Sequence, residues 1–291
     1  MNYRHAFHAG NHADVLKHVV LLALCEALTA KPAPCFAMDT HAGRGLYALD
    51  AEAARRTGEA DTGVARLSAT AAVNSSALPP AIRHYLDAVA ACRAGHGDTA
   101  YPGSPWLLAH ALRAQDRITC CELEPGEAAA LRVNLGRDQR VVVQLRDGYD
   151  AIHAQLPPRH GEVKLARGLV LVDPPYEAQL AEFDQARTAL RDGLQRWPQA
   201  TYALWYPIKQ RRPLQPFYRM AGNLPAASTL LVELLVRADD SPLRMNGSGM
   251  LLLNPPYRIE AVLAPALEAL SKALAGPGAP PPRLEWLKRP A

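Results

Sequence analysis

Short apolar runs, each with an acidic residue at or just past its end, constrain the fold of this 291-residue chain more than any other feature. Such runs, stopping at polar turn residues, predict buried strands. The four clearest are Cys35–Met38 before Asp39, Arg117–Cys121 before Glu122, Val141–Leu145 before Asp147 and Gly168–Val172 before Asp173. Helical stretches, among them 104–114 and 125–135, lie between them. This alternation predicts a doubly wound, mostly parallel α/β sheet, whose ligands bind beyond the carboxyl ends of the strands.

The remaining segments fit one domain, residues 1–291, with a helical insert at about residues 50–100. The stretch from Leu46 to Pro102 exceeds a usual connection by about 40 residues or more, so we expect an inserted helical subdomain there. Within it the pattern predicts a helix at 80–94 and a loop at 68–76. Asn11 is the expected cap of a helix that precedes the first strand and ends near Lys31. Other elements are expected at 201–208, 230–236 and 250–253 (strands), 259–274 (helix) and 283–287 (a short last segment).

Composition argues against a membrane span and a disulfide framework. The apolar runs are far shorter than the ~20 residues that a membrane helix requires, and the N-terminus does not resemble a signal peptide. The five cysteines show no C-x-x-C spacing and are odd in number, which is typical of reduced thiols. We therefore expect a soluble, cytoplasmic protein. Its net charge of +4 is compatible with a polyanionic partner but does not require one.

The run Asp173-Pro174-Pro175-Tyr176 predicts methylation of an amine on a nucleic-acid base. The amino nitrogen of adenine or cytosine is a poor nucleophile because its lone pair is delocalised into the ring. A carboxylate from Asp173 and the carbonyl of Pro174 can accept both amine hydrogens and turn the lone pair toward a methyl sulfonium. Tyr176 can stack on a base lifted out of its helix. The alternative is a structural turn with a surface aromatic residue, since Pro-Pro also simply marks turns.

A second copy of this motif, Asn254-Pro255-Pro256-Tyr257, competes with the first. Asparagine can accept amine hydrogens as well as aspartate can. The order of the strands favours Asp173, because it follows directly on the glycine turn and the strands that end at Glu122 and Asp147. Asn254 comes after further strands, so we expect it to lie in a turn that ends a late strand near the far edge of the sheet.

A turn rich in glycine, Asp39-Thr40-His41-Ala42-Gly43-Arg44-Gly45, is the expected binding turn for S-adenosylmethionine, since absent side chains let the backbone approach a ligand. Glu122 can accept both ribose hydroxyls, and Asp147-Gly148 suits the adenine edge. Each acid alone is more often a solvated strand end than a ligand. Two other functions remain open: a nicotinamide-dependent oxidoreductase, against which no third glycine follows at the dinucleotide spacing, and a non-catalytic RNA-binding module.

Four histidines, His5, His8, His12 and His18, lie close together near the N-terminus. We expect no metal site from them, because Arg4 and Lys17 intervene and no cysteine or carboxylate pair completes a ligand set. Instead, the polar stretch from residue 3 to residue 18 is expected to border the cleft, where its cations can meet the cofactor carboxylate or an RNA phosphate. A solvated helix face is the alternative.

Several motifs together resemble one family, the bacterial 23S ribosomal RNA adenine-N6 methyltransferases. They run almost from end to end: Tyr3-Arg4-His5-Ala6-Phe7-His8-Ala9-Gly10-Asn11-His12 through Lys17-His18, Asp39-Thr40-His41-Ala42-Gly43, Tyr101-Pro102-Gly103-Ser104-Pro105, Val172-Asp173-Pro174-Pro175-Tyr176 and Tyr202-Ala203-Leu204-Trp205-Tyr206-Pro207. This resemblance implies a monomeric, Rossmann-like class I methyltransferase with a helical insert. It also implies S-adenosylmethionine as cofactor and, as substrate, one adenine in a hairpin of 23S ribosomal RNA that is not yet assembled into the subunit.

The resemblance also assigns residues. Asp173 is the implied catalytic acceptor, and Tyr3 is implied to contact the RNA. The implied cofactor contacts are Lys17, His18, His41, Ser104, Glu122, Asp147, Gly148 and Asp173. Many methyltransferases have a glycine at the position of His41, the first glycine of this turn. The family that this sequence resembles has a histidine there, as this chain does. An alanine-rich insert after Asp61 and a proline-rich tail are departures that concern RNA contacts more than the chemistry.

Overall fold

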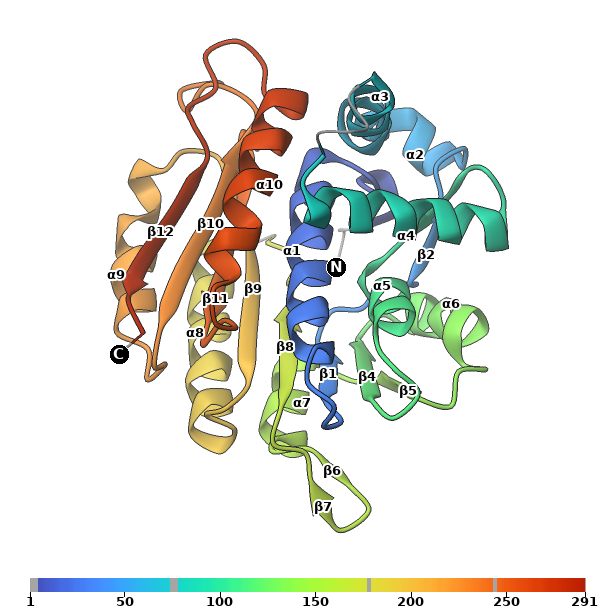
Figure 1. Ribbon diagram of the computed structural model, residues 1–291, viewed down its shortest axis with the longest axis vertical. Coiled ribbons are helices and arrows are strands. Elements are labelled where there is room, and N and C mark those ends of the chain that lie inside the picture. The colour runs from blue at the N-terminus through green and yellow to red at the C-terminus, as the bar shows by residue number, and fades with distance from the viewer. Residues whose placement is uncertain (1–4, 74–77, 177–178, 243–244, 291) are drawn as a thin grey trace.

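A computed structural model describes residues 5–73, 78–176, 179–242 and 245–290. An eight-stranded sheet lies between two layers of helices (Figure 1). From one edge to the other its strands are β12 (Arg283–Lys288), β10 (Thr229–Leu235), β11 (Gly247–Leu253), β9 (Thr201–Ile208), β8 (Gly168–Val172), β1 (Phe36–Asp39), β4 (Arg117–Glu122) and β5 (Val141–Leu145). β9, β8, β1, β4 and β5 are parallel. The prediction of a doubly wound, mostly parallel α/β sheet is thus confirmed.

Helices cover both faces of the sheet, and the chain reverses its direction of winding between β1 and β8. One face carries α1 (His12–Thr29), α5 (Ser104–Ala111), α6 (Pro125–Leu135) and α10 (Ile259–Leu274), whereas the other carries α7 (Gly148–Gln155), α8 (Gln179–Arg196) and α9 (Gln215–Gly222). Ligands of open parallel sheets bind at such a reversal, beyond the carboxyl ends of the strands. No helix in the described ranges is long and apolar enough to cross a membrane.

The helix before the first strand, α1, is buried along most of its length. The side chain of Asn11 caps it by accepting hydrogen bonds from the backbone N–H groups of Ala13 and Asp14, both at 2.9 Å. It packs against α4, α5, α10 and β11. A helix buried on all sides needs no polar face, so the charged residues that it does contain must be paired inside the protein.

Residues 46–102 leave the sheet through a two-stranded ribbon. The ribbon pairs β2 (Leu46–Ala48) with β3 (Ala100–Pro102) in antiparallel register. Between them lie α2 (Glu52–Thr57), the π-helical turn η2 (Asp61–Ala65), α3 (Arg66–Val73) and α4 (Pro80–His96). The loop predicted at 68–76 is wrong for 68–73, which are helical; 74–76 lie outside the described residues. Leu67 and Ala71, one turn apart, are the buried contacts of α3, and a mostly small-residue helix gives little apolar periodicity.

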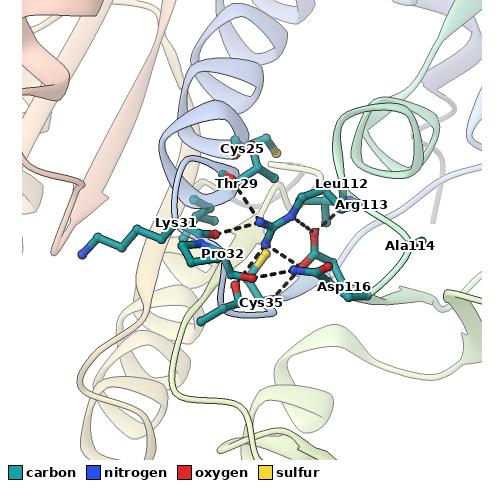
Figure 2. A network of polar contacts seen from close by, with 12 residues as sticks. Cys25, Thr29, Lys31, Pro32, Cys35, Leu112, Arg113, Ala114 and Asp116 are labelled. Carbon is teal, nitrogen blue, oxygen red and sulfur yellow. Dashed lines mark hydrogen bonds and ion pairs between the residues drawn. The ribbon is translucent and has the colours of Figure 1, made fainter.

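The other end of the sheet, where the parallel strands begin, is joined by a polar network (Figure 2). The Arg113 guanidinium donates to the carbonyl oxygens of Thr29, Lys31 and Ala33 at 3.1, 2.7 and 3.0 Å. It also contacts the buried Asp116 carboxylate, with Nε 3.0 Å from Oδ2. Asp116 in turn accepts from the backbone N–H of Cys35 at 2.9 Å. One arginine thereby connects the end of α1, the start of β1 and the turn before β4.

Candidate active site

A cavity of about 630 Å³ opens at the carboxyl ends of β1, β4, β5 and β8. Most of the residues that sequence reasoning assigned to the cofactor or the chemistry line this one cavity: Lys17, His41, Ser104, Glu122, Asp147, Gly148, Asp173 and Pro174. Neither His18 nor Tyr176 belongs to its lining. Tyr3 lies outside the described residues. Over the described part of the chain, no cluster of His, Cys, Asp or Glu could hold a metal ion.

Asp173 follows β8 directly and is paired with a lysine from α1. The Lys17 ammonium lies 2.6 Å from Asp173 Oδ2 and 2.9 Å from Asp14 Oδ1. Burial opposes the charge on Lys17, but the two carboxylates outweigh it and raise the pKa of Lys17 well above its usual value. The ammonium is therefore a fixed cation that orients the Asp173 carboxylate.

Asp14 anchors this arrangement from inside the helix. Its Oδ2 lies 3.0 Å from His5 Nε2 and accepts from the backbone N–H of Gly10 at 2.9 Å. Burial opposes ionisation, yet the charges of His5 and Lys17 hold the pKa of Asp14 well below its usual value. Sequence reasoning missed Asp14, although its position three residues before Lys17 is the spacing of an ion pair on one helix face.

His18, next to Lys17 in the chain, lies behind the cavity. Its Nδ1 is 3.0 Å from the Tyr101 hydroxyl, which is in turn 3.0 Å from the Tyr85 hydroxyl. Burial lowers the pKa of His18 to about 3, so the ring is neutral at physiological pH. Neighbours in a helix point about 100° apart, and here one faces the cavity while the other faces the insert.

The glycine turn after β1 brings backbone donors to the cavity wall. Gly43 and Gly45 have φ of 59° and 74°, which side chains disfavour. The Gly43 N–H donates to Glu122 Oε2 at 2.8 Å, and Oε1 of the same carboxylate accepts from the Glu124 N–H at 2.8 Å. Burial raises the pKa of Glu122, although these backbone hydrogen bonds lower it in part. Glu122 is thus held rigidly where β4 meets the cavity.

At the opposite wall, β5 leads into α7 at Asp147 and Gly148. The Asp147 side chain caps α7 by accepting from the Tyr149 N–H at 2.8 Å. A Cβ at position 148 would lie 2.0 Å from the carbonyl oxygen of Thr40, so only glycine allows this helix to approach the glycine turn. His41 Nδ1 is 2.7 Å from Thr40 Oγ1, and burial lowers the pKa of His41 to about 4. A neutral His41 does not repel a cationic ligand.

Tyr176 and Asp39 each lie next in the chain to a residue of the cavity lining but do not belong to the lining themselves. Tyr176 is half-buried: its hydroxyl donates to the carbonyl oxygen of Trp205 at 2.8 Å, and its ring centroid lies 5.1 Å from that of Phe183. Asp39, at the end of β1, is fully buried. Burial raises its pKa to about 7, against the lowering effect of a hydrogen bond with Ser104. The sequence analysis placed Asp39 at the end of the first strand and in the glycine turn but gave it no role of its own.

The competing motif lies at the opposite edge of the sheet. β11 is antiparallel to β9, so Asn254 follows β11 at the edge where β8 begins. The Asn254 side chain bonds to the backbone there, accepting from the Ala227 N–H at 2.7 Å and donating to the Pro198 carbonyl at 2.9 Å. The two motifs are separated by strand direction, not by distance along the sheet, since only β9 lies between β8 and β11.

Comparisons with known proteins agree with this geometry. A family model described as ribosomal RNA large subunit methyltransferase D, RlmJ, matches residues 32–288. The chain belongs to this family. Two curated relatives, the ribosomal RNA large subunit methyltransferases J of Haemophilus influenzae and Escherichia coli, are each 36% identical over 99% of both chains. A crystal structure of a Legionella pneumophila protein, 29% identical, has a TM-score of 0.82 and covers 96% of this chain and 98% of that one.

Membership of the RlmJ family confirms the resemblance read from the sequence motifs. It also confirms that the chain is a methyltransferase with S-adenosylmethionine as its cofactor. The two rival functions, a nicotinamide-dependent oxidoreductase and a non-catalytic RNA-binding module, are not supported. Within the RlmJ fold, the site stands where parallel sheets bind their ligands, at the reversal between β1 and β8.

Proposed function

We propose that this chain methylates the N6 amine of an adenine in large-subunit ribosomal RNA. The supporting observation is the place of Asp173-Pro174: it follows β8 at the edge of the cavity, with its carboxylate oriented by a buried ammonium. The two curated relatives are methyltransferases of large-subunit ribosomal RNA, which supports the same class of substrate here. Three finer points rest on the family resemblance of the motifs alone. These are the choice of adenine, the choice of a hairpin not yet assembled into the subunit, and a monomeric enzyme.

The cavity residues fit S-adenosylmethionine, which supplies an electrophilic methyl group when bound. Glu122, fixed by two backbone N–H groups, would accept the ribose hydroxyls. Asp147 and Gly148 would contact the adenine edge, and the glycine turn with His41 would lie along the middle of the ligand. Ser104 and Lys17 would contact its amino-acid end. His18 would act indirectly, because its ring supports α1 behind Lys17.

Asp173 would act by orientation. Lys17 contacts Oδ2, so Oδ1 can accept one amine hydrogen while the Pro174 carbonyl accepts the other. The nitrogen lone pair then points into the cavity. No strong base is required, because the amine becomes acidic only once it is methylated and can then lose its proton to water. Tyr176 would present the exposed part of its ring to the flipped base, while Trp205 and Phe183 hold the rest, and Tyr3 would contact the RNA.

The test is methylation of total RNA from a strain that lacks the protein, with labelled S-adenosylmethionine and mapping of the labelled nucleotide. We expect a single N6-methyladenine in large-subunit RNA. Asp173→Ala should lower kcat by at least about 100-fold, in the range of other lost catalytic groups, and reduce cofactor affinity only in part.

Asn254→Ala serves as the comparison, because the same kind of motif stands there outside the lining of the active-site cavity. It should lower stability, since two backbone groups lose a partner, but leave kcat of the folded enzyme near that of the wild type. Normal turnover by Asp173→Ala, or a label on cytosine, would overturn the proposal.

A further inference from the structure

The positive charge of the molecule is concentrated at the edge of the sheet opposite the active site. This rear edge comprises the connections at which the parallel strands begin, together with the ends of β11 and β12. Its connections, 30–35, 112–116, 136–140, 156–167, 197–200, 223–228, 254–258 and 289–290, contain nine arginines and lysines but three acidic residues, a surplus of six. The whole chain has a net charge of only +4.

The catalytic edge carries no such surplus. Its described connections, 40–45, 123–124, 146–147, 173–176, 209–211, 236–242 and 245–246, contain five arginines and lysines and five acidic residues. Of the two edges, only the rear edge therefore carries a surplus of positive charge. A polyanion that approaches the active site finds a neutral surface there, whereas the rear edge attracts it.

Two of the three rear-edge acids are already paired with arginines. Asp116 contacts Arg113, and Asp138 Oδ2 lies 2.6 Å from Arg140 Nη2. Other cations of this edge extend into solvent. Figure 2 shows the Lys31 side chain pointing away from the Arg113 network, although the Lys31 carbonyl belongs to it. Cations that are not needed inside the fold remain available to a ligand.

A short hairpin, β6 (Arg159–His160) with β7 (Val163–Lys164), projects from the rear edge (Figure 1). All four of its strand residues are exposed. Arg159 is paired directly with Lys164 across the hairpin. Like charges at directly opposed positions destabilise an antiparallel pair, so the Arg159 and Lys164 side chains do not stabilise the hairpin through each other. An anion bound between the two side chains would relieve the repulsion.

An exposed aromatic residue joins the cations. Tyr257 is 88% exposed, and the Arg258 guanidinium lies 5.5 Å from the centre of its ring. Arg258 and Asn254 are the only non-glycine residues with positive φ in the described part of the chain, at 61° and 50°. Backbone strain of this kind persists where the surroundings fix it and often marks binding sites. An aromatic ring with a stacked arginine is a surface on which an unpaired base can stack.

We infer that the rear edge is a second RNA-binding surface, which holds a segment of the ribosomal RNA other than the one that carries the target adenine. This rests on the proposed function for the identity of the RNA. The five residues of β8 alone separate the two edges by about 17 Å. This is roughly twice the Debye length, the ~8 Å beyond which salt at physiological concentration largely screens the interaction between exposed charges. Phosphates at the active site are thus screened from these cations, and the rear edge selects long RNA over a short hairpin.

The experiment compares the wild type with the variant Lys31→Gln/Arg159→Gln/Lys164→Gln. These three side chains are exposed, so the fold should be unaffected. A matched control, Arg191→Gln/Arg219→Gln/Lys272→Gln, removes three exposed cations from the outer helices α8, α9 and α10. Binding of full-length large-subunit RNA and of a short hairpin with the mapped adenine is measured by filter retention from 50 to 300 mM salt, alongside methylation of each.

For full-length RNA we expect the rear-edge variant to bind at least about tenfold more weakly, with a plot of log affinity against log salt that is shallower by about 2. Hairpin binding and methylation should match the wild type, and the control variant should match it on both RNAs. An unchanged salt slope on full-length RNA would overturn the inference. Binding of both proteins to phosphatidylglycerol vesicles is measured as well, and a variant that loses vesicle binding but no RNA binding would also overturn it. Because binding is measured apart from methylation, a wrong choice of target base leaves this comparison readable.

Discussion

Asp39 and Asp173 end neighbouring strands of the sheet, yet their carboxylates meet different surroundings. Asp173 contacts the Lys17 ammonium at 2.6 Å. Asp39 is fully buried, and its Oδ2 has no hydrogen-bond partner within the described chain. A buried carboxylate without a full set of donors favours its neutral form, which is why burial raises the pKa of Asp39 to about 7. The region therefore combines a carboxylate oriented by an ammonium with a second, buried carboxyl group whose pKa is raised.

This difference predicts a pH-dependent stability that Asp39→Asn removes. An unfolded aspartate titrates near ~3.9, so between about pH 4 and pH 7 the folded wild type holds a proton that the unfolded chain has lost. Its stability then falls as pH rises through this window and levels off above it. Asparagine resembles the neutral acid in shape and does not titrate.

Urea unfolding of both proteins between pH 4 and pH 8 measures the effect. The free energy of unfolding of Asp39→Asn, relative to that of the wild type, should increase as the pH rises to about 7. Above this pH the difference should stay constant. Parallel pH profiles would show that Asp39 is ionised in the folded protein over the whole range.

Residue type and chain order predicted which acids meet at the cavity but not which side chains of α1 line it. Glu122, Asp147 and Asp173 were found because each ends a strand, and the ends of parallel strands share one edge. Lys17 and His18 lie in a helix that is buried on every side, so periodicity does not distinguish the side that faces the cavity. Only the packed fold places Lys17 in the cavity lining and His18 outside it.

At the scale of the element, the positions of the strands and long helices could be predicted from the sequence. The direction of a strand within the sheet, and a helix with little apolar periodicity such as α3, could not. The predicted ranges 168–172 and 259–274 coincide with β8 and α10 at both ends, because long apolar patterns end at clear turn residues. The direction of β11 depends on its partners β9 and β10. The local sequence does not specify this direction. We expected Asn254 to be far from the site along the sheet, whereas the structure separates the two because β11 runs in the opposite direction.

The network around Arg113 predicts the stability of the joint between α1, β1 and β4. Arg113→Ala leaves three carbonyl oxygens and a fully buried carboxylate without their main donor. Burial opposes ionisation of Asp116, and the hydrogen bonds from Arg113 and Cys35 hold its pKa below the usual value. Only the Asp116 side of this pair is fully buried, because the Arg113 side chain is 28% exposed. Leaving one buried acceptor without its donor costs about 1–3 kcal/mol, so we expect a loss in this range.

Urea unfolding at pH 7 should show this loss in Arg113→Ala. Arg113→Lys, which keeps the charge but lacks the planar fork of donors, should lose an intermediate amount. Because the network lies at the edge away from the cavity, kcat of the folded fraction should stay near that of the wild type. A large loss of kcat in Arg113→Lys without a loss of stability would contradict a purely structural role.

At the scale of the whole molecule, the cavity joins segments that are far apart in the chain. Its walls come from α1, the glycine turn after β1, the end of β4, the start of α7 and the residues after β8. A ligand that contacts all of them must lose these contacts when the chain unfolds. Such a ligand stabilises the folded state by about 2.7 kcal/mol at one hundred times its Kd.

For 291 residues, an unfolding entropy of roughly 2.1 cal/mol/K per residue converts this energy into a Tm increase of about 4 °C. S-adenosylmethionine should produce this shift in a thermal unfolding scan, and NADH at the same concentration should produce none. Glu122→Gln keeps the size of the side chain but presents one acceptor oxygen in place of two, so it should lose most of the shift while binding of RNA is retained. An equal shift in wild type and Glu122→Gln would place the ribose elsewhere in the cavity, and a shift with NADH alone would argue against the cofactor.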